Sequence, residues 1–180
     1  MFTRNALVVA SAVLLASAWL RDVAAQEGPN LGVPATPEQI AGWDISIGPD
    51  GRGLPAGSGT AGVGKAVYEL KCLACHGQEG AGRPNDQLVG GHGTLESPAA
   101  VKTVGSYWPY ATTLFDYIRR AMPYLQPQSL SNDETYALTA YLLFLNGVIA
   151  EDAAMNAQTL PAVAMPNRGN FVWAYPNSSE

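Results

Sequence analysis

Residues 72–76 read Cys-Leu-Ala-Cys-His, and this stretch decides the fold of the chain. Cys72 and Cys75 are three positions apart, so at the end of a helix both thiols lie on one side. Each thiol can then add to a vinyl group of the same porphyrin, and His76 follows with its imidazole beneath the ring. The pattern predicts one covalent haem c, attached through Cys72 and Cys75, with His76 as an iron ligand.

Two other chemistries use paired cysteines, and both fit this sequence less well. A thioredoxin-type redox pair needs a βαβ setting, and no run here alternates as a strand does. A zinc site needs about four ligands, and His92 is the only histidine besides His76. The chain has no further cysteine. Haem attachment is therefore the preferred interpretation of the motif.

The second axial ligand of the iron has four candidates, namely Met122, Met155, Met165 and His92. Met122 precedes Pro123 in a loop between two expected helices, where the fixed proline backbone would keep the thioether directed at the haem. Met155 fits better as a filler of core gaps, Met165 lies beyond the last helix, and His92 lies in a glycine-rich loop. We predict Met122 as the ligand. Ligation by His and Met fills both axial positions and favours electron transfer over oxygen or peroxide chemistry.

The rest of the haem domain is expected to be helical. The expected helices are residues 64–75, 112–121 and 133–146. In the first, Leu70 belongs to an apolar stripe that leads to the motif. Pro123 stops the second, and the third is capped by Ser131 or Asn132 and ended by Gly147. The predicted fold is all-α, with three main helices around one haem.

Two long irregular arms flank this haem domain, which we place at residues 64–147. The N-terminal arm, residues 26–63, is rich in glycine and proline and contains one expected helix at 37–43; residues 57–60 are expected to be flexible. The C-terminal arm, residues 148–180, lacks periodicity. Apolar residues dot both arms, so each is expected to pack on a partner or on the chain's own haem domain.

The first residues and the overall charge indicate where the protein works. Residues 1–25 have a positive start, an apolar run and small residues before Gln26, the layout of a signal peptide. An uncleaved anchor is the alternative, although the run is short for a membrane span, and no span is expected in the mature chain. With 47% hydrophobic residues the chain suits a globular domain, and its net charge of −5 argues against nucleic-acid binding.

Some residues near the motif are candidates for supporting roles. Tyr107, Trp108 and Tyr110 precede the second helix, where they would line the haem edge or form ordinary aromatic core. Pro84 is a candidate for accepting or shaping the hydrogen bond that orients His76.

With the motif, the helix order and the methionine loop in place, residues 64–146 resemble a class I cytochrome c. Further segments are similar to the cytochrome subunits of periplasmic sulfur and sulfite dehydrogenases. These segments are Trp43–Ile45, Pro49–Pro55, Gly90–Gly91, Thr94–Leu95, Val101–Ala111, Phe115–Pro123 and Met165–Phe171.

The resemblance implies a periplasmic monohaem subunit that is not catalytic alone. It would form a heterodimer with a molybdenum-cofactor subunit that oxidises sulfite or another sulfur compound, and would pass the electrons to a further cytochrome c. Sulfur dehydrogenase subunits of this kind can carry a second haem domain, whereas this chain has one haem motif, which favours a one-haem sulfite dehydrogenase subunit or a shorter relative. Two alternatives stay open: a free diffusible carrier, and a haem enzyme with an open iron position.

Overall fold

The computed structural model describes residues 31–172 and 174–175. The signal peptide expected at residues 1–25 lies outside the described residues. Within the described part of the chain, no helix has both the length and the apolar character needed to cross a membrane. The chain divides into two units, one ending at Trp43 and the other beginning at Asp44.

The described part of the first unit, residues 31–43, contains one short helix, α2 (Pro37–Trp43). The Thr36 hydroxyl accepts a hydrogen bond from the Gln39 backbone N–H at 3.2 Å, and the Gln39 side chain accepts one from the Thr36 N–H at 2.8 Å. This reciprocal pair is the arrangement of a capping box. It confirms the helix expected at 37–43. All residues from 31 to 43 are exposed.

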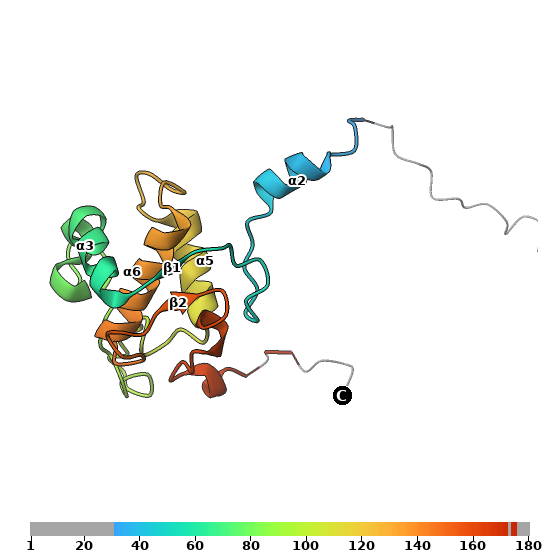
Figure 1. Cartoon of the computed structure of the whole chain (residues 1–180). Coiled ribbons are helices and arrows are strands. Elements are labelled where there is room, and N and C mark those ends of the chain that lie inside the picture. Colours follow the sequence, from blue (N-terminus) through green and yellow to red (C-terminus); the bar gives the residue numbers. More distant parts are fainter. Residues whose placement is uncertain (1–30, 173, 176–180) are drawn as a thin grey trace, which may run out of the picture. The chain divides into compact units, whose positions relative to one another are not determined.

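The second unit is built on three main helices (Figure 1). They are α3 (Ala61–Lys71), α5 (Ala111–Ala121) and α6 (Asn132–Leu145), and both α3 and α5 pack against α6. A short helix, α4 (Leu73–His76), follows α3 after Cys72. The all-α prediction is confirmed. The second and third helices begin and end within one residue of the expected positions, whereas the first begins three residues earlier and is divided at Cys72.

Helix α6 forms the centre of this unit, because every residue from 135 to 143 is buried. Two of the buried residues are threonines, and their hydroxyls donate to the carbonyl four residues earlier, Thr135 to Ser131 at 2.9 Å and Thr139 to Thr135 at 2.7 Å. These bonds satisfy the buried hydroxyls, so a helix that contains polar residues can be buried on all of its faces. Tyr136 packs on Phe115 of α5, with the ring centroids 4.4 Å apart.

Glycine allows α3 to approach α6 closely. A Cβ at Gly64 would overlap the Ala137 carbonyl, and one at Gly59 would overlap the Ala137 backbone nitrogen. The backbone at Gly59 and Gly64 therefore lies directly against the α6 backbone at Ala137. One turn further along, Tyr68 of α3 packs on Tyr141 of α6, with centroids 5.4 Å apart. This crossing fixes the direction in which α3 delivers the Cys-X-X-Cys-His motif.

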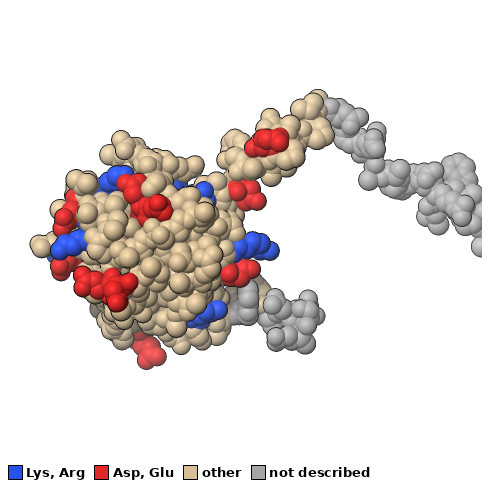
Figure 2. Space-filling model, viewed as in Figure 1, with Lys and Arg blue, Asp and Glu red and all other residues tan. Residues whose placement is uncertain are grey.

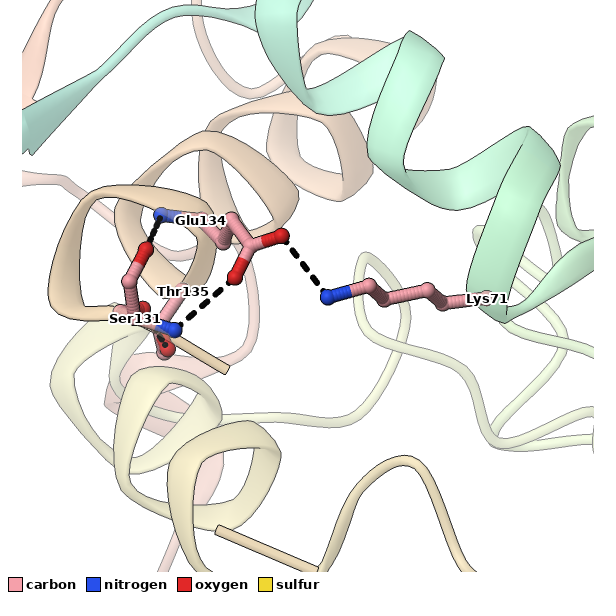
Figure 3. A network of polar contacts seen from close by, with 4 residues as sticks. All are labelled: Lys71, Ser131, Glu134 and Thr135. Carbon is pink, nitrogen blue, oxygen red and sulfur yellow. Dashed lines mark hydrogen bonds and ion pairs between the residues drawn. The ribbon is translucent and has the colours of Figure 1, made fainter. Parts of the chain in front are cut away.

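The first turn of α6 is tied to the last turn of α3 (Figure 3). Ser131 caps α6: its hydroxyl accepts from the Glu134 N–H, and the Glu134 carboxylate accepts from the Ser131 N–H. The other carboxylate oxygen of Glu134 forms an ion pair with Lys71 at 2.7 Å. One carboxylate thus completes the cap of one helix and holds the C-terminus of another, beside Cys72.

Residues 44–60 of the expected N-terminal arm pack on the chain's own helices. The Ile47 N–H donates to Asp116 of α5 at 3.1 Å, and the Ile47 side chain is buried. The Tyr136 hydroxyl donates to the Pro55 carbonyl at 2.9 Å. The flexibility expected for residues 57–60 is wrong, because β1 (Ser58–Gly59) pairs antiparallel with β2 (Met155–Asn156). A two-residue strand shows no alternation, so the sequence does not reveal it.

The C-terminal arm also packs on the second unit. After β2 it forms two short 3-10 turns, η2 (Leu160–Ala162) and η3 (Arg168–Asn170). It buries three apolar side chains in the core, those of Met155, Leu160 and Met165. A Cβ at Gly51 would collide with Pro161, so the two arms also touch each other. The sequence left open whether the arms pack on a partner or on the chain's own haem domain. Residues 44–60 and 148–165 pack on the chain's own haem domain.

Candidate haem-binding site

The Cys-X-X-Cys-His motif forms one tight turn between α3 and the following loop. The Cys72 N–H donates to the Tyr68 carbonyl at 2.8 Å, which continues the α3 ladder. The Cys72 carbonyl then accepts from the N–H groups of both Cys75, at 3.1 Å, and His76, at 3.0 Å. Both thiols are free; Cys72 is half-buried and Cys75 is exposed. The Cys72 carbonyl thus holds both Cys75 and His76 close to Cys72.

The pKa of the Cys72 thiol argues against the redox-pair interpretation. Burial raises the pKa of Cys72 to about 11, and the nearby charge of Lys71 only partly opposes this. Reactive cysteines of Cys-X-X-Cys redox sites have a lowered pKa instead. For zinc, no group of three or more His, Cys, Asp or Glu side chains among the described residues is arranged to hold a metal ion. The site therefore differs from both alternatives to haem attachment.

The His76 side chain is oriented by a backbone carbonyl. Its Nδ1 lies 2.9 Å from the carbonyl oxygen of Asp86. Since a carbonyl can only accept, Nδ1 is the donor in this contact, which leaves Nε2 as the ring nitrogen available to bind a metal. This is the usual outer partner of a metal-bound histidine. An imidazole held through Nδ1, beside two free thiols on one turn, is the donor set that haem c requires.

The loop after His76 brings Asp86 back to the imidazole. The Gly82 N–H donates to the His76 carbonyl at 2.8 Å, and the Asn85 N–H donates to the Cys75 carbonyl at 2.9 Å. Gly77 begins the loop with a φ of 73°, which favours glycine, and a Cβ there would overlap the Gly82 carbonyl. Pro84 was a candidate for accepting or shaping the His76 hydrogen bond; it is not the acceptor, which is the Asp86 carbonyl two residues later.

The candidate axial ligands differ sharply in burial. Met122 directly follows α5, its N–H donates to Ile118 at 3.0 Å, and its side chain is half-buried. Met155 and Met165 are each only 4% exposed and belong to the core cluster. His92 is exposed. Among the methionines that the structure describes, Met122 alone is not enclosed by the core.

The aromatic residues before α5 interact mainly with the C-terminal arm. The Tyr107 ring meets Phe171 edge-on at 5.5 Å, and Arg168 lies over the Tyr110 ring at 5.0 Å. Trp108 packs against Tyr117 at 5.7 Å. Tyr107 and Tyr110 therefore pack against residues of the C-terminal arm.

The surface around the site carries exposed apolar side chains. Leu70, expected on a buried stripe of the first helix, is exposed, and so are Tyr124 and Leu125 after Met122. The reason for the Leu70 error is that α3 buries a different face against α6, the one that carries Gly64 and Tyr68. On the face drawn in Figure 2, the Lys and Arg side chains of the described residues lie singly among Asp and Glu.

The Cys-X-X-Cys-His turn, together with the packing of α3 and α5 on α6, is typical of one class of haem protein. The comparisons with known proteins identify the same class. The Cytochrome c family model matches residues 62–146. Together with the structural relative described next, this match shows that the chain belongs to the cytochrome c family. The predicted class I cytochrome c fold is thereby confirmed. Family membership also implies covalently bound haem c and a role in electron transfer.

Among solved structures, the chain is similar to one from the sulfane dehydrogenase SoxCD of Paracoccus pantotrophus. The two share 42% sequence identity with a TM-score of 0.76. The match covers 83% of this chain and 73% of that chain, so it extends well beyond the residues that match the family model. A search of the curated proteins found no match.

Proposed function

We propose that this chain is a monohaem cytochrome c subunit of a periplasmic sulfur-compound dehydrogenase. In this proposal Cys72 and Cys75 attach the haem, and His76 and Met122 ligate its iron. The chain accepts electrons from a molybdenum-cofactor catalytic subunit and passes them to a further cytochrome c. The observation that carries the proposal is the 42% identity, over 83% of the chain, to a chain of a sulfane dehydrogenase.

Haem c supplies one-electron transfer when it is bound at this site. Side chains of this protein would hold the haem so that electron transfer is favoured over the binding of small molecules. Cys72 and Cys75 fix the porphyrin to α4, while the His76 Nδ1–H bond to Asp86 at 2.9 Å keeps the imidazole in one orientation and one tautomer. Met122, half-buried at the end of α5, would supply the second protein ligand to the iron. With two protein ligands on the iron, binding of oxygen or peroxide would be disfavoured.

A free diffusible carrier is the second candidate, and one observation favours it. Residues 44–60 and 148–165 bury their apolar side chains in the chain's own core, with Ile47, Met155, Leu160 and Met165 as examples. These parts of the arms therefore need no partner to cover them. Within their own unit, the apolar residues Leu31, Val33, Ile40 and Trp43 are exposed.

The two candidates are separated by purification of the native protein from a periplasmic extract. For a subunit, haem absorbance and molybdenum elute together from size exclusion at the mass of a complex, and sulfite or another sulfur compound reduces the haem in that fraction. Elution of all the haem at the mass of this chain alone, with no molybdenum, would establish the free carrier instead.

A further inference from the structure

Tyr68 contacts the haem-attachment turn from both of its ends. It lies on α3 with only 1% of its surface exposed. Its backbone carbonyl accepts the N–H of Cys72 at 2.8 Å, and its hydroxyl donates to the carbonyl of Gly77 at 2.8 Å. The first contact precedes the motif and the second follows it. One buried side chain thus bridges α3 and the residue that begins the loop after His76.

Gly77 is the residue at which the path of that loop is set. It ends α4 and precedes the 3-10 turn η1 (Gln78–Gly80). Its carbonyl has one other donor within the loop, the Gly80 N–H, at a longer distance of 3.4 Å. The Tyr68 hydroxyl is therefore the shorter bond to this carbonyl, and it joins the loop to a rigid helix.

The same loop ends at the group that orients the imidazole. From Gly77 the chain turns at η1 and returns to place the Asp86 carbonyl 2.9 Å from His76 Nδ1. This placement is held by backbone bonds to the Cys75 and His76 carbonyls, both within the motif itself. Among the hydrogen bonds of the described residues, the Tyr68 bond is the one that ties the start of the loop to a side chain of α3. Loss of that bond would remove the tie between the loop and α3, and would leave the backbone bonds alone to hold Asp86 against His76.

We propose that Tyr68 is a positioning residue for the haem: its hydroxyl holds the loop so that the Asp86 carbonyl stays bonded to His76 Nδ1, which sets the reduction potential. The inference rests on the proposed ligation of iron by His76. A hydrogen bond at Nδ1 makes the imidazole a more basic ligand and so favours the oxidised iron. Weakening it must raise the potential.

The hydroxyl remains a donor over the working range of pH. Burial is the main cause that raises the pKa of Tyr68 to about 12. The phenol is therefore neutral and keeps its proton at any pH near neutrality.

The experiment compares Tyr68→Phe with Tyr136→Phe in the purified haem-containing protein. Tyr136 is a matched control, because it is also buried, at 0% exposed, and donates to a backbone carbonyl at 2.9 Å, but that carbonyl belongs to Pro55. Each change removes one hydroxyl and one hydrogen bond. Midpoint potentials are measured by spectroelectrochemical titration, and free energies of unfolding by denaturant.

Tyr68→Phe is expected to raise the midpoint potential, with at least about a threefold change in the ratio of reduced to oxidised protein, about 28 mV at 59 mV per tenfold. Tyr136→Phe leaves the potential unchanged, although both variants lose stability. In proton NMR, the Nδ1 proton of His76 exchanges with solvent faster in Tyr68→Phe alone. Equal potentials for Tyr68→Phe and wild type would overturn the inference, and so would an equal shift in both variants.

Should Tyr68→Phe fail to retain haem, the wild-type protein supplies the test. Rates of exchange with solvent are then compared for two protons in the wild type. The His76 Nδ1 proton is expected to exchange no faster than the Tyr68 hydroxyl proton. Exchange at His76 while the Tyr68 hydroxyl stays protected would show that the two are not linked. Wild-type protein without an iron–His76 bond would instead refute the proposed function.

Discussion

The chain contains the dipeptide Met-Pro twice, and the two copies lie in different environments. Met122-Pro123 directly follows α5, with Met122 half-buried and the next two residues, Tyr124 and Leu125, exposed. Met165-Pro166 lies in the C-terminal arm, where Met165 is 4% exposed and packed in the core. The same two residues thus end a helix beside exposed apolar surface in one place and fill the interior in the other.

The difference shows that a ligand methionine is identified by what surrounds it and not by the residue that follows. A thioether enclosed by other side chains gains its stabilisation from packing and has no open side for a metal. A thioether at the end of a helix, beside a loop, keeps one side available. Met122 has the second kind of setting. Two variants test the comparison, and a third, at Glu134, gives a reference for a small change in stability.

The largest effect is expected from Met122→Ala. The haem stays attached through Cys72 and Cys75, but the oxidised protein loses the weak far-red absorption band that marks methionine–iron coordination, and it binds cyanide rapidly. Because methionine ligation raises the potential, the midpoint potential falls by more than about 59 mV, a tenfold change in the redox ratio. Absorption spectra and redox titration measure both effects. An unchanged band would remove Met122 from the site.

Met165→Ala is the matched control and is expected to act on stability alone. Truncating a buried methionine costs about 2–5 kcal/mol of unfolding free energy, measured by denaturant titration. The far-red band and the midpoint potential stay as in the wild type, because in the proposed ligation Met122 binds the iron and Met165 fills the core. Loss of the band in this variant would reverse the assignment of the two methionines.

The smallest effect is expected from Glu134→Gln. This residue lies in neither Met-Pro region, and the variant shows how much stability is lost when a partly exposed ion pair is removed. The hydrogen bond from Lys71, followed by that from the Ser131 N–H, lowers the pKa of Glu134 below 4.5. A lowered pKa in the folded state means that the ionised carboxylate stabilises the fold above pH 4.5, and that this stabilisation disappears as the pH falls through the folded-state value.

Glu134→Gln is therefore expected to lower the unfolding free energy at pH 7 by less than about 1 kcal/mol, since the ion pair is partly exposed. The difference from wild type shrinks as the pH falls below 4.5. Thermal unfolding at several pH values measures it, with Lys71→Met as the partner variant. A difference that grows in acid would contradict the sign of the pKa change.

Much of the helical framework was predictable because its signals are local. Ser131 and Glu134 are three residues apart and define the start of α6 by themselves, and Thr36 with Gln39 does the same for α2. The motif at residues 72–76 likewise predicts its own chemistry. Such features need only the neighbouring sequence.

The unpredicted features depend on contacts between distant residues. Gly59 looks like part of a flexible linker in the sequence, yet it pairs with Met155 and lies against Ala137. Leu70 looks like part of a buried stripe, yet the glycine-mediated crossing with α6 turns it outward. The hydrogen bonds of His76 to Asp86 and of Tyr68 to Gly77 depend on the path of a loop, for which the sequence has no periodic signal.

The pairing of β1 with β2 also affects the order of folding events. Ser58 meets Asn156, and Gly51 meets Pro161, so a segment made before the haem motif is completed by one made after the last helix. Such long-range contacts pay a loop-closure entropy and slow folding. During synthesis the motif at 72–76 is therefore complete well before the residues that close the fold around it have been made.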